Sequence, residues 1–131
     1  MKTKSALLLV VDDEELVRDM LAERLANEHT QVLTASSARE ASQLIEQHRF
    51  DVVVSDIIMP DGDGIELLLE LKRKGDRTPL IAITAHHEIY LQAVKRLGAA
   101  SCFRKPLDIE ALQEAIQRLL DDPPLAHQES S

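Results

Sequence analysis

The feature that most limits the fold of this chain is a fivefold alternation of short apolar runs with longer segments of helical period. The runs are rich in β-branched residues and predict buried strands; they lie at residues 6–11, 31–35, 52–55, 79–84 and 100–104. The segments of helical period span residues 14–27, 37–48, 64–74, 87–97 and 108–121. Five strand–helix units of this size predict an α/β fold, a doubly wound parallel sheet with helices on both faces.

Residues at the segment ends agree with these helix limits. Residues 37–40 fit a capping box, and Asp63 with Glu66 resembles one. Gly75 and Gly98 stand where the third and fourth helices should end.

Composition restricts the class of protein. The 131 residues suit a single domain, which we assign to residues 1–121, with residues 122–131 as a polar, proline-containing tail or linker. A net charge of −8 with 2% aromatic residues argues against direct nucleic-acid binding. The single cysteine, Cys102, allows no intrachain disulfide, and no apolar run approaches the length of a membrane span. We therefore expect a cytoplasmic protein without a membrane partner.

Four of the five predicted strands end in a polar or charged residue. The first leads into Asp12 and Asp13, the third into Asp56, the fourth into Thr84 and the fifth into Lys105. In open parallel sheets the ligand site lies at the carboxyl ends of the strands. We therefore expect these side chains to meet at one rim of the sheet.

Three carboxylates at one rim must bind protons, a cation or both, because two of them about 4 Å apart repel by roughly 4 kcal/mol. Neither His nor Cys accompanies them at a strand end, and hard oxygens alone favour Mg²⁺. Lys105 adds a positive charge suited to phosphate, and Thr84 adds a small donor. Because Asp12 and Asp13 are adjacent and can share the metal, Asp56 is the best candidate to accept a phosphoryl group.

Each residue alone has an ordinary structural interpretation. Asp12 fits a helix cap, Asp56 a turn, Thr84 a strand end and Lys105 a solvated surface. Their joint occurrence at the same end of four strands favours the functional interpretation.

The sequence resembles the response-regulator receiver family of two-component signalling, over about residues 5–121. The matching segments are VVDDEE at 10–15, SDIIMPDGDG at 55–64, TA at 84–85 and KP at 105–106. The resemblance implies a flavodoxin-like fold, with a five-stranded sheet of order 2-1-3-4-5 and five helices.

The same resemblance implies roles for the acidic residues. Asp56 accepts a phosphoryl group from a phosphohistidine on a sensor histidine kinase or a histidine phosphotransfer protein. Mg²⁺ is held by Asp13, Asp56 and the backbone carbonyl of Ile58, while Asp12 acts largely through water.

It also implies a switch. Lys105 binds the phosphate, Thr84 moves onto it after transfer, and the Lys105–Pro106 bond is cis. The family's usual switch aromatic stands three residues before the lysine, where this chain has Cys102. The adjacent Phe103 cannot replace it, because neighbouring strand residues face opposite sides of a sheet.

Phosphorylation is then expected to change the surface made by the fourth helix, fifth strand and fifth helix. Tyr90 in the fourth helix is a candidate for docking there, with ordinary helix surface as the equal alternative. The downstream partner is either a separate effector or a fused output domain, and a homodimer is left open. Gly62 in the loop after Asp56 should alter loop mobility more than chemistry.

Other functions and sites fit the sequence less well. An aspartyl-nucleophile phosphatase or phosphotransferase would carry Asp-x-Asp on its first strand and a cap domain, whereas here the two acids are adjacent. A phosphorylation-independent binding module would lack an acid, the lysine or the hydroxyl, and all are present. Dinucleotide binding lacks its glycine motif after the first strand. His86 and His87 have no other His or Cys at ligand spacing, and Cys102 lies inside an apolar strand.

Overall fold

The computed structural model describes residues 5–57, 64–74, 77–85 and 88–122. Strands and helices alternate along the chain, as the sequence pattern predicts, and every boundary lies within two residues of its predicted position. The elements are β1 Ala6–Val11, α1 Glu15–Leu25, β2 Thr30–Ala35, α2 Ala38–Gln47, β3 Val52–Asp56, α3 Gly64–Arg73, β4 Leu80–Thr84, α4 Glu88–Arg96, β5 Ser101–Arg104 and α5 Ile109–Asp121.

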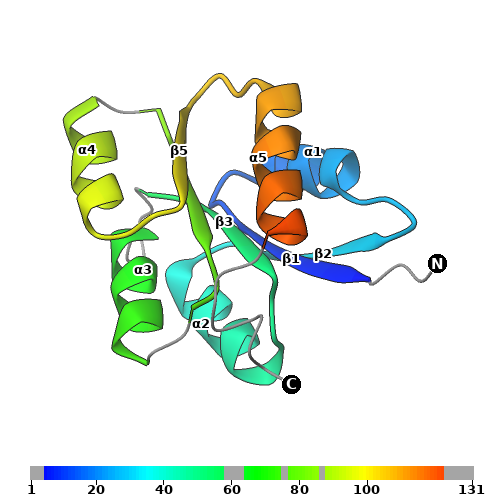
Figure 1. Cartoon of the computed structure of the whole chain (residues 1–131), viewed down its shortest axis with the longest axis horizontal. Coiled ribbons are helices and arrows are strands. Elements are labelled where there is room, and N and C mark those ends of the chain that lie inside the picture. Colours follow the sequence, from blue (N-terminus) through cyan, green and yellow to red (C-terminus); the bar gives the residue numbers. More distant parts are fainter. Residues whose placement is uncertain (1–4, 58–63, 75–76, 86–87, 123–131) are drawn as a thin grey trace.

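The five strands form one parallel sheet of order β2-β1-β3-β4-β5, which confirms the predicted doubly wound fold (Figure 1). The chain leaves β1 toward β2 on one side and returns to β3 on the other, so the strand order reverses between β1 and β3. Ligand sites of such sheets lie at this reversal, at the carboxyl ends of the strands.

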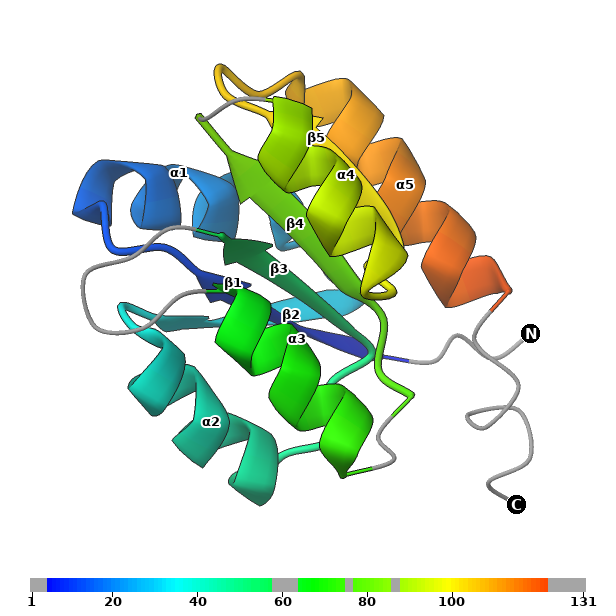
Figure 2. The same ribbon diagram turned by 90° about the vertical axis from the view of Figure 1, so that its left-hand side faces the viewer.

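Helices cover both faces of the sheet. Helices α2, α3 and α4 lie in front of it in Figure 2, whereas α1 and α5 lie behind it. Strand β1 supplies both cores, with Leu9 and Val11 facing α2–α4 and Leu8 and Val10 facing α1 and α5. Burial on both faces explains why the central strands are continuous apolar runs instead of alternating ones.

The predicted signals at Ser37 and Gly98 are confirmed as helix ends, with one difference at Ser37. Ser37 caps α2 by accepting a hydrogen bond from the backbone N–H of Glu40. The Glu40 side chain returns to Ser36 and accepts from both its N–H and its hydroxyl, instead of closing a box on Ser37.

Gly98 ends α4 with a φ of 107°, a conformation that glycine adopts without strain. The N–H groups of Gly98 and Ala99 donate to the carbonyls of Lys95 and Val94, which makes this end a Schellman motif. The signals at Asp63 and Gly75 lie outside the described residues. No helix in the described part of the chain is long and apolar enough to cross a membrane.

Candidate functional site

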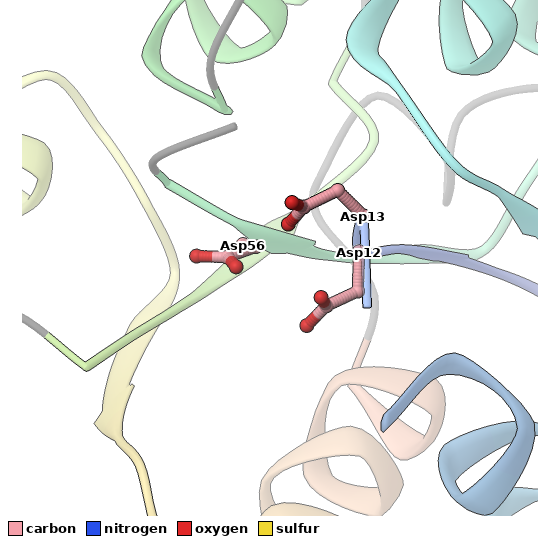
Figure 3. A group of neighbouring side chains, drawn as sticks. All are labelled: Asp12, Asp13 and Asp56. Atoms are coloured by element: carbon pink, nitrogen blue, oxygen red, sulfur yellow. The ribbon is translucent and has the colours of Figure 1, made fainter. Parts of the chain in front are cut away.

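The acidic residues named from the sequence meet where the strand order reverses. Asp12 and Asp13 follow β1, and Asp56 is the last residue of β3. Because Val11 pairs with Ser55, the next residues along, Asp12 and Asp56, are brought level at the ends of neighbouring strands. One oxygen from each of the three carboxylates lies within 4.8 Å of the other two (Figure 3).

Asp12 is fully buried, and its two oxygens have different surroundings. Oδ1 accepts a hydrogen bond from the N–H of Glu14 at 2.9 Å, which closes a turn just before α1. The N-cap residue of α1 is Glu14, so Asp12 is not the helix cap that it could be taken for in the sequence. Oδ2 lies 3.1 Å from the ammonium of Lys105, yet within the described residues no donor points at it with hydrogen-bond geometry. A buried carboxylate oxygen without a hydrogen bond is costly. This oxygen therefore fits a pocket built to face a cation.

Lys105 follows β5 and reaches across to the acids. Its Nζ donates to Asp56 Oδ2 at 3.2 Å and to Glu14 Oε1 at 3.0 Å, and its side chain is only 16% exposed. Burial alone would lower the pKa of the ammonium, but the contacts with Glu14, Asp12 and Asp56 outweigh it, and the pKa lies well above its usual value. Lys105 is therefore positively charged at every physiological pH.

Thr84 is fully buried at the end of β4. Asp56 pairs with Ile83, so Thr84 lies one position beyond it on the neighbouring strand. The carbonyl of Thr84 accepts the N–H of Lys105 at 2.8 Å, and the Lys105–Pro106 bond that follows is cis, as the resemblance implied. Together with the acids, Thr84 and Lys105 complete the rim expected from the strand ends.

Some predicted positions lie outside the described residues, among them Ile58, Gly62, His86 and His87. The side chain of Tyr90 is also not described. The expected roles of these residues stay predictions.

Two residues at the site were not singled out from the sequence. Glu14 binds Lys105 although the two are 91 positions apart, and its place in a run of four acids at the start of α1 gave no sign of this. Arg18 donates from a guanidinium nitrogen to the carbonyl of Asp12 at 2.8 Å and so fixes the turn that carries the acids.

Gly64, the first residue of α3, is a third such residue. A Cβ at this position would overlap the carbonyl oxygen of Asp56 and press on Ser55 and Ile57. The Gly64 N–H donates to the carbonyl of Ile57 at 2.7 Å. Only glycine lets α3 begin so close to the backbone of Asp56, and a glycine opening a helix was the available signal.

Comparison with known proteins agrees with this geometry. The sequence profile of the response regulator receiver domain matches residues 8–117. The chain is 35% identical over 122 residues to the transcriptional regulatory protein GlrR of Escherichia coli K12. This alignment covers 92% of this chain and 28% of GlrR. It is 33% identical to sporulation initiation phosphotransferase F of Bacillus subtilis, covering 86% of this chain and 92% of that protein.

Solved structures give the same result. The receiver domain of Francisella response regulator 1452 aligns with a TM-score of 0.85 at 26% identity, over 92% of this chain and all of that one. The response regulator TrrA of Thermotoga maritima aligns with a TM-score of 0.79 at 30% identity, over 87% of this chain and 98% of that one. The chain therefore belongs to the response regulator receiver domain family of two-component signalling.

Proposed function

We propose that this domain is a phosphorylation-activated switch in which Asp56 accepts a phosphoryl group. The observation that carries the proposal is the position of Asp56, which is buried beside two further carboxylates and 3.2 Å from the Lys105 ammonium. The donor is a phosphohistidine on a sensor histidine kinase or a histidine phosphotransfer protein. The relative named a phosphotransferase supports phosphoryl transfer as the reaction.

The residues present fit a Mg²⁺ ion. Asp12, Asp13 and Asp56 offer hard oxygens, and the buried Oδ2 of Asp12 receives no hydrogen bond from the part of the chain that the structure describes. We assign the ion to Asp13, Asp56 and the carbonyl of Ile58, with Asp12 acting largely through water. When bound, Mg²⁺ neutralises the acids and lowers the charge on the phosphoryl oxygens. The TrrA structure, described as a complex with Mg²⁺ and a beryllium fluoride, supports this choice.

The chain's own residues account for the remaining chemistry. The ionised carboxylate of Asp56 attacks phosphorus directly and needs no general base. The histidine nitrogen of the donor leaves as its bond to phosphorus breaks, and Lys105 offsets charge on the phosphoryl oxygens. Water later hydrolyses the acyl phosphate and resets the domain. This is self-catalysed transfer and decay, not turnover of a metabolite.

Phosphorylation then changes the surface made by α4, β5 and α5. The phosphoryl group adds roughly −1.5 to −2 charges at Asp56. Reversing the equilibrium between the inactive and active conformations of this surface from about 1:99 to 99:1 requires about 5.5 kcal/mol of differential stabilisation. Hydrogen bonds from Thr84 and Lys105 to the phosphoryl group supply about 1.5–3 kcal/mol each. Those bonds are of the right size to move the end of β4, β5 and the adjoining helices.

The output is a change in partner binding at that surface. The chain spans 28% of GlrR and 92% of phosphotransferase F, so its relatives include both longer regulators and single-domain ones. We assign residues 1–121 to the receiver and residues 122–131 to a tail or linker. The downstream partner is a separate effector or a fused output domain.

Incubation with acetyl phosphate and Mg²⁺, followed by intact mass measurement, tests the assignment. We expect one added phosphoryl group, lost with a chelator and absent in Asp56→Asn. Asp19→Asn is the matched control, because Asp19 is an exposed aspartate on α1, and it should be labelled like the wild type. Full labelling of Asp56→Asn would contradict the site.

A further inference from the structure

Three carboxylates share the ammonium of Lys105. Its Nζ lies 3.2 Å from Asp56 Oδ2, 3.1 Å from Asp12 Oδ2 and 3.0 Å from Glu14 Oε1. An ammonium has three protons and accepts no hydrogen bond. Lys105 donates hydrogen bonds to Asp56 Oδ2 and Glu14 Oε1, and it faces Asp12 Oδ2 as an ion pair. The oxygens of a phosphoryl group on Asp56 therefore compete for the ammonium with carboxylates that already surround it.

Burial decides which contact is given up. The side chains of Asp12 and Asp56 are 0% and 8% exposed at the ends of their strands, whereas that of Glu14 is 61% exposed. A carboxylate released into water regains its hydration, but a buried one left without its cation does not. Glu14 is the partner that Lys105 loses at the lowest cost.

The local fold does not explain why Glu14 reaches Lys105. Glu14 occupies the N-cap position of α1, but its side chain makes no capping hydrogen bond. Glutamate is not among the residues favoured at this position. The N–H of Glu14 is already bonded to Oδ1 of Asp12, so the helix start does not depend on the Glu14 carboxylate.

We propose that Glu14 is a releasable counter-ion, which holds Lys105 until a phosphoryl group on Asp56 displaces it. Glu14 is thus a positioning residue that acts through Lys105 and sets how readily the domain accepts a phosphoryl group. The inference rests on the function proposed above, and it adds a residue that opposes phosphoryl binding while favouring the bound cation.

Two affinities should change in opposite directions when Glu14 becomes Gln. Loss of one negative charge near the acids should weaken Mg²⁺ binding about two- to fivefold, the range of an exposed ion pair. With Mg²⁺ saturating, Lys105 no longer has to leave Glu14, so fluoroberyllate, an analogue of the phosphoryl group, should bind about two- to fivefold more tightly. Both differences should shrink with added salt, because Glu14 is exposed. A damaged start of α1 would weaken both affinities.

The experiment measures Mg²⁺ and fluoroberyllate binding to the full chain by calorimetry, for the wild type, Glu14→Gln and Glu15→Gln. Glu15 is the matched control because it is exposed in the first turn of α1. In the described chain it is not one of the carboxylates within 4.0 Å of Lys105 Nζ. Lysine ammonium NMR signals give a second measurement, with the Lys105 signal assigned through Lys105→Arg.

We expect Glu14→Gln to show the opposed changes and Glu15→Gln to show neither gain in fluoroberyllate affinity nor a changed Lys105 signal. The Lys105 signal of Glu14→Gln should differ from wild type in the free protein and coincide with it in the fluoroberyllate complex. Equal or weaker fluoroberyllate binding by Glu14→Gln, or an unchanged free Lys105 signal, overturns the inference alone. No binding to the wild type with Mg²⁺ overturns the proposed function and this inference with it.

Discussion

Cys102 and Phe103 are neighbours on β5, yet they pack into different cores. Cys102 lies against the core under α2, α3 and α4, whereas Phe103 lies against the core under α1 and α5. The expectation that these two side chains face opposite sides of the sheet is confirmed. Phe103 therefore cannot take the place of an aromatic side chain at position 102.

We predict that Cys102→Tyr changes the response of the output surface more than it changes phosphorylation. Cys102 pairs with Ala82, two positions before Thr84, and is half-buried beside α4. A tyrosine is larger than the space that the thiol fills. We therefore expect its ring to change position when Thr84 moves, as the switch aromatic of the family does. Amide NMR shifts in α4, β5 and α5 on adding Mg²⁺ and fluoroberyllate should grow.

The rate of labelling by acetyl phosphate should stay within about twofold of wild type, because Cys102 packs against the core under α2, α3 and α4 and is not one of the residues assigned to the acidic pocket. Cys102→Val, which stays small and apolar, is the control and should leave both measurements unchanged. Identical shift changes in Cys102→Tyr and wild type would rule out a role for position 102 in the switch.

The thiol of Cys102 should react slowly. Burial raises its pKa, and the charge of Lys95 offsets this only in part. The reactive thiolate is therefore scarce at pH 8. Alkylation of the folded chain by iodoacetamide should be several-fold slower than in urea and should accelerate as the pH rises. A folded rate equal to the rate in urea would contradict the raised pKa.

Gly64→Ala should damage both the fold and the site. The added Cβ would meet the backbone carbonyl of Asp56, and neither group is the end of a flexible side chain. Overpacking of this kind costs about 1–3 kcal/mol, and the shift it forces falls on the residue that accepts the phosphoryl group. Chemical denaturation and intact mass after acetyl phosphate treatment measure the two effects.

Gly98→Ala is the matched control for that substitution. Gly98 has a φ of 107°, at which alanine is strained, but the group that an added Cβ would meet is the flexible end of the Lys72 side chain. It should lower stability by about 1 kcal/mol or more and leave labelling of Asp56 intact. Normal labelling of Gly64→Ala would show that the close approach of α3 is structural only.

The fold and the outline of the site were predictable because each depends on local patterns and one topological rule. The apolar runs and their helical partners identify five strand–helix units, and the rule that ligands bind at the carboxyl ends of strands selects Asp12, Asp56, Thr84 and Lys105. No contact between these residues had to be known in advance, since parallel strands bring their ends to one rim.

The contacts missed from the sequence depend on side-chain reach between distant segments. In the sequence, Glu14 is an ordinary acid at a helix start, and its contact with Lys105 is visible only in the folded structure. Likewise, the Glu40 carboxylate accepts from the N–H of Ser36, whereas Ser37 contributes its hydroxyl to the N–H of Glu40. Spacing alone does not distinguish such neighbours.

The hydrogen bond between Ser42 of α2 and Glu70 of α3 should make stability depend on pH. The Ser42 hydroxyl donates to Glu70 Oε1 at 2.5 Å. This bond, reinforced by Lys74, lowers the pKa of Glu70 below its usual value of 4.5. A carboxyl whose pKa is lowered by folding stabilises the folded state above its unfolded pKa, and that contribution is lost as the pH falls through the folded pKa.

Ser42→Ala should therefore raise the pKa of Glu70 toward its ordinary value and remove part of the stability gained between acid and neutral pH. Alanine favours a helix more than serine does, so the net loss at pH 7 is reduced, but this gain is the same at every pH. The loss at pH 7 relative to pH 3 should be about 0.5–1.5 kcal/mol, measured by denaturation at both values. In Glu70→Gln, which cannot titrate, Ser42→Ala should produce no such difference. An equal effect of Ser42→Ala at both pH values in the wild-type background would mean that the serine does not act through the charge of Glu70.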